Sequence, residues 1–175
     1  MVFPERFSDL PAATWPRLRA LLDVPTKASE TINMTIGEPR HAFPAFVGEI
    51  LAANLQGFGK YPDNYGTAPH LEAIQGFLNR RYGLDMPVDQ ILTLNGTREG
   101  LYNAAMALCR EEKHGQKPVI LTPNPFYQVY AVAALSVGAE PVYLPTTRES
   151  GFLPDFASLD AETLDRTAID RKSVV

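Results

Sequence analysis

Cysteine, basic charge and long apolar runs are scarce in this sequence, and each scarcity excludes a class of protein. Cys109 is the only cysteine, so no disulfide forms within the chain and a cysteine-rich zinc site is excluded. The 16 basic side chains are outnumbered by 20 acidic ones, and because a nucleic-acid surface normally needs a basic excess, no nucleic-acid partner is expected. The longest mostly apolar run, residues 129–139, is far shorter than the roughly 20 residues that span a bilayer, so no membrane segment is expected.

Other signals of specialised proteins are missing too. The N-terminus has no apolar core behind a basic start, so we expect no signal peptide and a cytoplasmic protein. The three histidines show no metal-ligand spacing, so no metal site is expected. No P-loop, G-x-G-x-x-G or G-x-S-x-G motif is present. With 175 residues, of which 45% are hydrophobic and 21% charged, the composition is that of a soluble globular domain.

Hydrophobic periodicity predicts a helical first half and an alternating second half. In the first half we predict a helix from Thr14, an extended stretch over residues 32–36, and helices over residues 44–55 and 69–82, the last capped by Gly83. In the second half we predict strands over residues 91–94, 119–121 and 141–144, alternating with helices over residues 98–110 and 126–137. This alternation predicts an α/β fold with a largely parallel sheet. No strand is expected after the helix-like residues 157–164, so the fold looks unfinished.

The first candidate site is the turn Asn95-Gly96-Thr97, between a predicted strand and a predicted helix. A glycine lets the backbone approach a ligand closely, and the N–H groups that follow, with the Thr97 hydroxyl, form a cradle that suits a phosphate. The same residues are also consistent with a plain turn in which Thr97 caps the helix.

The second candidate is the segment PNPFYQVY, residues 123–130, directly after a buried strand. Aromatic side chains at the C-terminal end of a strand lie where α/β proteins bind ligands, and they can stack on a planar heterocycle. The alternative is that Phe126 and Tyr130 are core residues and Tyr127 a surface ring. Two weaker segments are IGEP at residues 36–39 and YPDNYG at residues 61–66, which on their own also suit a turn and a surface loop.

Taken in order, the four segments resemble the class I/II aminotransferases, pyridoxal-phosphate enzymes of the type I fold. Residues 36–39 resemble the family's early glycine motif, and Tyr61 with Gly66 matches its Tyr-Pro-x-x-x-Gly loop. Residues 95–99, NGTRE, resemble the phosphate-binding turn, and residues 124–127 the ring-stacking motif. The resemblance covers roughly residues 15–168. Within the family the motifs look most like bacterial succinyldiaminopimelate transaminases of lysine biosynthesis, with acetylornithine, aromatic and LL-diaminopimelate aminotransferases as related branches.

The resemblance implies pyridoxal 5′-phosphate as the cofactor and assigns it two groups of residues. The backbone of Gly96, Thr97 and Arg98, with the Thr97 hydroxyl, would hold the cofactor phosphate. Tyr127 would stack on the pyridine ring.

Two more residues gain roles from the same resemblance. Tyr61 would reach the cofactor phosphate of the neighbouring subunit in a homodimer, and the Gly37 backbone would lie beside the substrate carboxylate. The implied reaction is ping-pong amino transfer from an amino acid or N-acyl diamino acid to a 2-oxo acid such as 2-oxoglutarate. His70 departs from the family pattern, where a large apolar residue is usual, which leaves the start of the nearby helix open.

The Schiff-base lysine of the family has no counterpart in the sequence. None of the five lysines has the family's lysine context: Lys27, Lys60, Lys113, Lys117 and Lys172. We therefore expect an incomplete type I fold, with an arm or small-domain segment over residues 1–45, the first part of the large cofactor domain over residues 46–168, and a divergent tail over residues 169–175.

The expected truncation, for example by a frameshift, has consequences for activity and stability. The chain alone would be inactive, because the nucleophile is missing. It would also be poorly stable, because unpaired strand edges and uncovered apolar faces favour aggregation. Two alternatives stay open: a non-catalytic remnant that binds the phosphate weakly or pairs with a full-length partner, and an unrelated small α/β phosphate-binding domain.

Overall fold

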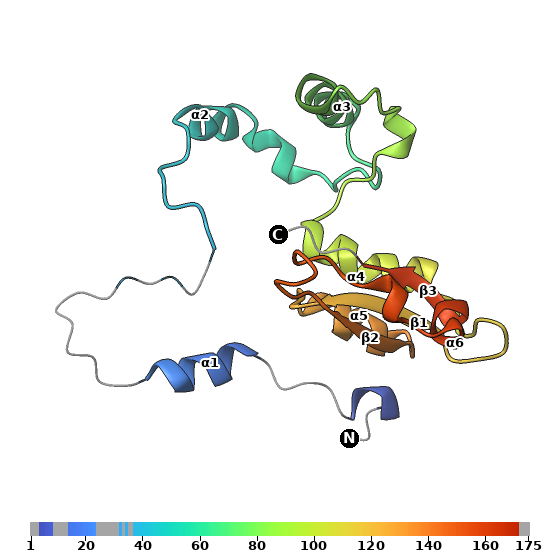
Figure 1. Ribbon diagram of the computed structural model, residues 1–175. Helices are drawn as coiled ribbons and strands as arrows, with labels where there is room; N and C mark the ends of the chain where they lie inside the picture. The colour runs from blue at the N-terminus through green and yellow to red at the C-terminus, as the bar shows by residue number, and fades with distance from the viewer. Residues whose placement is uncertain (1–3, 9–13, 24–31, 33, 35–36, 172–175) are drawn as a thin grey trace. The chain divides into compact units, whose positions relative to one another are not determined.

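The computed structural model describes residues 4–8, 14–23, 32, 34 and 37–171, and it divides into two compact units (Figure 1). One unit comprises Thr14–Thr93, and the other comprises Leu94–Val175 with the first residues, Met1–Ala13. Most of the extended stretch predicted over residues 32–36 lies outside the described residues. Within the described part of the chain, no helix has the length and apolar character to cross a membrane.

The Thr14–Thr93 unit is helical, as predicted. It contains α1 (Thr14–Leu22), α2 (Phe46–Ala53) and α3 (Ala68–Tyr82), with 3-10 turns at Leu55–Gly59 and Val88–Gln90. The predicted end of α3 is confirmed: Gly83 adopts φ +68°, and the N–H groups of Gly83 and Leu84 donate to carbonyls of the last helical turn. No residue of α1, α2 or α3 is buried, so this unit has no apolar core of its own along its helices.

The second unit is built on a three-stranded parallel sheet. Its strands are β1 (Val119–Asn124), β2 (Glu140–Pro145) and β3 (Thr167–Asp170), in the order β2-β1-β3. Its helices are α4 (Thr97–Leu108), α5 (Val129–Ser136) and α6 (Ala161–Arg166). The central strand β1 is buried over all residues except its last, as a strand covered on both faces should be.

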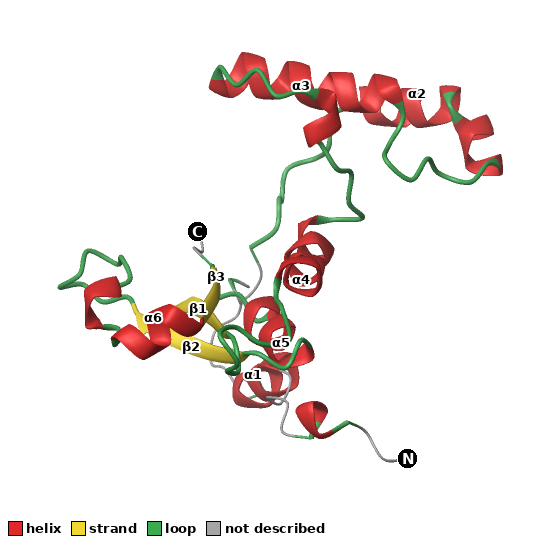
Figure 2. Ribbon diagram, turned by 90° about the vertical axis from the view of Figure 1, so that its right-hand side faces the viewer, coloured by secondary structure: helices red, strands yellow, loops and turns green. Residues whose placement is uncertain are grey.

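The two faces of β1 carry separate apolar clusters, because successive side chains of a strand point in opposite directions. Ile120 packs with alanines of α4, α5 and the turn before β2: Ala105, Ala133, Ala134 and Ala139. Val119 and Leu121 pack on the other face with Leu144. Figure 2 shows α4 and α5 on one side of the strands and α6 on the other. The parallel α/β unit predicted from the sequence is therefore confirmed.

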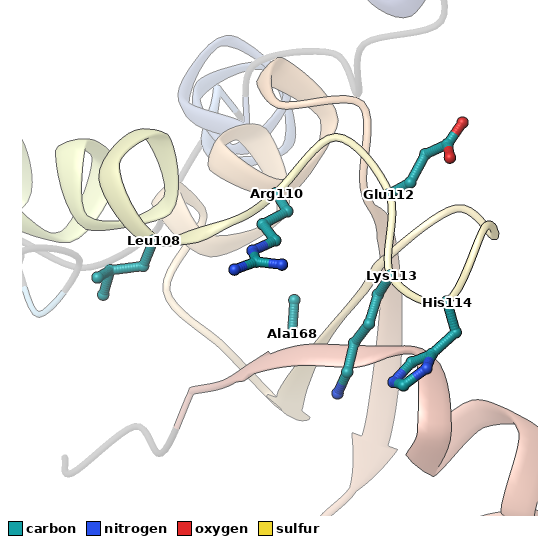
Figure 3. A pocket seen from close by; sticks show the side chains of 6 residues that line it. All are labelled: Leu108, Arg110, Glu112, Lys113, His114 and Ala168. Atoms are coloured by element: carbon teal, nitrogen blue, oxygen red, sulfur yellow. The ribbon is translucent and has the colours of Figure 1, made fainter.

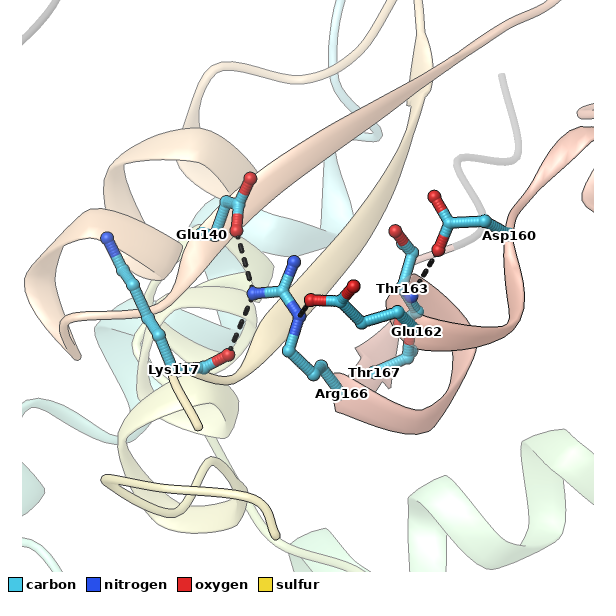
Figure 4. Close-up of polar contacts among 7 residues, drawn as sticks. All are labelled: Lys117, Glu140, Asp160, Glu162, Thr163, Arg166 and Thr167. Carbon is cyan, nitrogen blue, oxygen red and sulfur yellow. Dashed lines mark hydrogen bonds and ion pairs between the residues drawn. The ribbon is translucent and has the colours of Figure 1, made fainter. Parts of the chain in front are cut away.

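A polar cluster joins α6 to the amino-terminal ends of β1 and β2 (Figure 4). The Arg166 guanidinium donates to Glu140 Oε2 at 2.9 Å and to the Lys117 carbonyl at 3.1 Å. Its side chain is only 16% exposed, and Glu162 Oε1 lies 3.8 Å from its Nε. At the other end of α6, Asp160 accepts a hydrogen bond from the Thr163 N–H at 2.6 Å. The Arg166 contacts fix α6 against the sheet, and the Asp160 bond caps the first turn of the helix.

Two strand predictions are wrong, and both errors concern pairing. Residues 91–94 are not a strand: Ile91 has extended dihedral angles, but the segment pairs with no other strand among the described residues. A strand also follows α6, where none was expected, because β3 pairs with the open edge of β1. An apolar pattern is local, whereas a ladder needs a partner from elsewhere in the chain.

Candidate cofactor-binding site

The amino terminus of α4 presents free backbone donors. Gly96 precedes the helix with φ +118°, a conformation that side-chain-bearing residues rarely adopt. No side chain caps the helix, so the first N–H groups of α4 keep their capacity to donate. They also lie at the positive end of the helix dipole, where anions are stabilised. Thr97 is not the cap of the helix, because it is the first helical residue and Gly96 occupies the cap position. Phosphate binding at this turn stays a prediction.

Glu99 fixes this turn from within the helix. Its Oε2 accepts a hydrogen bond from the Asn95 N–H at 3.2 Å. In a capping box such a glutamate accepts from the N–H of the cap residue itself, whereas here it accepts from the residue before the cap. The carboxylate thus binds a donor before the helix, and the N–H groups of Thr97 and Arg98 remain available. Sequence reasoning missed this role of Glu99, because the bond joins residues four apart, whereas a capping box joins residues three apart.

Tyr127 lies in the loop that follows the carboxyl end of β1. Its side chain is 36% exposed, and it packs edge-on against Tyr130, with ring centroids 6.0 Å apart and planes at 90°. Tyr130 is buried at 7% exposure, so its predicted alternative as a core residue is confirmed. Phe126 is half-buried and stacks on Tyr143 at 4.9 Å. The loop therefore holds one half-exposed ring on a buried aromatic base.

Arg98 joins the two motifs. Its Nε–H donates to the Tyr127 hydroxyl, across a separation of 29 residues, and its guanidinium carbon lies 5.3 Å from the Tyr127 ring centroid. This contact places the start of α4 beside the aromatic loop, at the carboxyl end of the central strand, where α/β sheets bind ligands. Free N–H groups and a half-exposed planar ring at one edge suit a phosphorylated planar heterocycle. We call Gly96, Thr97, Arg98 and Tyr127 the cup.

Arg171, which sequence reasoning missed, contacts both α4 and the aromatic ring on which Tyr127 packs. Arg171 donates to the Leu101 carbonyl of α4, and its guanidinium carbon lies 5.5 Å from the Tyr130 ring centroid. The Arg171 N–H also extends the β3 pairing to the Leu121 carbonyl at 2.9 Å. Arg171 lies in the tail that was expected to diverge because the family resemblance ends at residue 168, and no spacing rule connects it with Tyr130.

The other two predicted site residues belong to the Thr14–Thr93 unit. Tyr61 is fully exposed, and a Cβ added at Gly37 would have no atom within 4 Å. The structure therefore brings four of the six predicted residues together, and the roles of Tyr61 and Gly37 stay predictions.

Comparison with known proteins identifies the family of this chain. The family model for aminotransferase class I and II matches residues 29–174. The chain is 30% identical over 169 residues to an LL-diaminopimelate aminotransferase of Syntrophobacter fumaroxidans, covering 94% of this chain and 42% of that protein. It is 31% identical over 140 residues to an aspartate aminotransferase of Pyrococcus horikoshii, covering 79% of this chain and 34% of that protein.

Solved structures give the same result. An aminotransferase of Neisseria meningitidis matches with a TM-score of 0.86 and 31% identity, covering 96% of this chain and 43% of that one. The chain thus spans less than half the length of these relatives, which fits the incomplete type I fold predicted from the sequence. Because the family model matches most of its residues, the chain belongs to the class I and II aminotransferase family, whose members depend on pyridoxal 5′-phosphate.

Proposed function

We propose that this chain forms the amino-terminal part of a pyridoxal-phosphate-dependent aminotransferase and that the cup binds the cofactor. The contact between Arg98 and Tyr127 carries the proposal, because it unites the phosphate-binding turn with the ring-stacking loop. The backbone N–H groups of Thr97 and Arg98 and the exposed Thr97 hydroxyl would hold the phosphate, and Tyr127 would face the pyridine ring. When bound, the cofactor supplies an electron sink for amino transfer between an amino acid and a 2-oxo acid.

The conformation of Gly96 fits this role. Its φ of +118° turns the chain so that the next N–H groups point out of the helix start, and it has no side chain to occupy the phosphate position. The Arg98 guanidinium donates its Nε–H to Tyr127, and the backbone N–H of Arg98 lies at the helix start, where it can bind the phosphate. The guanidinium thereby orients the ring that would stack on the cofactor.

The substrates follow from the family at the level of a class. The relatives named for LL-diaminopimelate and aspartate support an amino dicarboxylic acid as donor. Succinyldiaminopimelate, with 2-oxoglutarate as acceptor in lysine biosynthesis, is the narrowest form of this proposal, and these relatives support only the broader class. The same proposal includes a homodimer and a cytoplasmic location. It also places the Gly37 backbone beside the substrate carboxylate and Tyr61 at the cofactor of the partner subunit. The 175-residue chain alone should be inactive, because no lysine occurs in the Schiff-base context.

A cofactor titration tests the cup. Pyridoxal 5′-phosphate should bind the chain non-covalently. In a competition titration it should bind more tightly than AMP or glucose 6-phosphate. Gly96→Ala should weaken binding about tenfold, because a side chain at positive φ is strained. Gly138→Ala is the matched control, since Gly138 has φ +75° but precedes β2 at the opposite edge of the sheet.

Two outcomes would count against the proposal. Equal affinity in Gly96→Ala and Gly138→Ala would show that the turn holds no phosphate. Preference for the nucleotide or the sugar phosphate would favour an unrelated phosphate-binding domain. Tyr127→Ala should weaken binding of the cofactor but not of inorganic phosphate, because only the cofactor has a ring to stack.

A second candidate function is pairing with a full-length relative without catalysis. It is favoured by large apolar side chains that are more than half exposed on α2 and the turn after it: Phe46, Ile50, Leu51, Leu55 and Phe58. Native mass spectrometry of the chain mixed with a complete aminotransferase tests this function through the mass of a heterodimer.

A further inference from the structure

A basic pocket lies at the amino-terminal edge of the sheet, opposite the cup. It has a volume of about 390 Å³ and is lined by the end of α4, the loop after it and the start of β3: Leu108, Arg110, Glu112, Lys113, His114 and Ala168. The cup lies at the carboxyl end of β1, whereas this pocket is lined by Ala168, the second residue of β3, at the amino-terminal end of that strand. The volume is within the range of small-molecule sites. No role in the proposed aminotransferase reaction accounts for the pocket.

Arg110 supplies a free guanidinium. Figure 3 shows its side chain facing the space above Ala168. Among the described residues Arg110 side-chain nitrogens have no hydrogen bond or ion pair, so the charge is not used to cap the last carbonyls of α4. A guanidinium carries five N–H donors in a planar fork, which matches the oxygens of a carboxylate or a phosphate.

A tight turn places two more basic side chains at the same pocket. Lys113 and Gln116 exchange backbone hydrogen bonds at 2.9 and 3.1 Å, which closes a turn over His114 and Gly115. His114 has φ +54° and Gly115 φ +72°, the left-handed pair that such a turn requires. The Lys113 ammonium donates to the Thr167 carbonyl at the start of β3, which fixes the lysine while two of its donors stay free. His114 Nε2 lies 3.9 Å from Asp165 Oδ1, too far for a hydrogen bond.

The charge of the pocket is unbalanced. Glu112 is the only carboxylate among the lining residues, and Figure 3 shows its carboxylate turned away from Arg110. Neither Arg110, Glu112 nor Lys113 forms an ion pair within the described ranges of the chain. The positive charges of Arg110 and Lys113 therefore exceed the single negative charge of Glu112 among the lining residues.

We propose that this pocket binds a small anion that carries a carboxylate or phosphate group, held by the Arg110 fork and the Lys113 ammonium. The chemistry of the donors selects the anionic head, and the volume admits a small metabolite but no polymer. The site is independent of the cup, because it uses different residues at the opposite edge of the sheet.

Titration of the full 175-residue chain with inorganic phosphate, with succinate and with chloride tests the proposal. Backbone amide shifts of residues 110–116 in two-dimensional NMR should saturate with phosphate, with succinate or with both, but not with chloride at equal ionic strength. Saturation by succinate alone identifies a carboxylate ligand, and saturation by phosphate alone identifies a phosphate ligand. Saturation by neither overturns the proposal.

Variants separate this pocket from the cup and from general charge effects. Arg110→Gln should weaken binding about tenfold while leaving phosphate-induced shifts at residues 96–98 unchanged. Arg148→Gln is the matched control, since Arg148 is exposed and lies outside the pocket. Glu112→Gln should tighten binding about two- to threefold, because it removes the only lining carboxylate. An Arg110→Gln affinity equal to that of Arg148→Gln, or an unchanged affinity in Glu112→Gln, overturns the proposal.

Discussion

Replacing Arg166 by alanine should loosen the sheet, because this side chain joins α6 to two strands. Its guanidinium donates to Glu140 Oε2 at 2.9 Å and to the Lys117 carbonyl at 3.1 Å, and it is 16% exposed. A hydrogen bond that involves a charged group contributes about 1.5–3 kcal/mol when it is buried. The Glu140 side chain is 45% exposed, so solvent screening reduces that contact to about 1 kcal/mol. The bond to the Lys117 carbonyl is also open to solvent, so it contributes about 1–2 kcal/mol, and we expect a total loss of about 2–3 kcal/mol.

Hydrogen exchange measures this loss at the strands concerned. If opening and closing are fast relative to exchange, 2–3 kcal/mol corresponds to a fall of about 30- to 150-fold in the protection of β1 and β2 amides. Glu140→Gln should cost about 1 kcal/mol or less, because its amide oxygen still accepts from Arg166. Combining the two changes in a double-mutant cycle should give a coupling of about 1 kcal/mol.

Arg148→Ala provides the control for this experiment. Arg148 is exposed, and no hydrogen bond or ion pair is found for its side chain within the described residues, so its replacement should change protection by less than about 0.5 kcal/mol. If Arg166→Ala lowers β1 protection no more than Arg148→Ala does, the polar cluster does not hold α6 on the sheet, and the reasoning is refuted.

Three further predictions follow from single features. Thr122 is fully buried and its hydroxyl has no partner among the described residues, so Thr122→Val should raise the protection of β1 amides by about 1 kcal/mol. Ile120→Val removes a buried methylene group and should lower this protection by about 1 kcal/mol. The hydrogen bond from the Thr163 N–H lowers the pKa of Asp160 below its ordinary 3.8, so the cap of α6 is complete above that pH and lost as pH falls through the lowered pKa. The Thr163 amide shift should follow this titration, and persistence of the titration in Asp160→Asn would contradict the assignment. Amides of α1–α3 should exchange faster than those of β1, because these helices bury no residue, and equal protection would contradict this. A cooperative thermal melt of a monodisperse sample would contradict the predicted poor stability of the chain.

The turn and the loop of the cup could be predicted from the sequence, but their contact could not. Gly96 before a helix and Tyr127 after a buried strand are local patterns, and both occur where the residues indicated them. The bond between Arg98 and Tyr127 spans 29 residues, and its geometry depends on how α4 and β1 pack. The bond from Asn95 to Glu99 lies one residue outside the capping-box spacing. The contacts of Arg171 depend on the register of β3 against β1 and have no sequence signal.

The two strand errors have the same physical origin. Residues 91–94, ILTL, form a short, mostly apolar run, which locally favours a strand, yet they have no ladder partner among the described residues. Residues Thr167–Asp170 carry only Ala168 and Ile169 as apolar side chains, so their pattern is weak. They become β3 because the open edge of β1 supplies the missing hydrogen bonds.

The same distinction explains why the two units differ in burial. A helix satisfies its backbone within its own segment, so α1, α2 and α3 form wherever the local sequence favours them, although they bury no side chain. Short helices of this kind are only marginally stable without a packed apolar face. A strand needs a partner, and β1 finds one on each side. The stability of this chain should therefore reside in the β1 unit, which also carries the cup and the basic pocket.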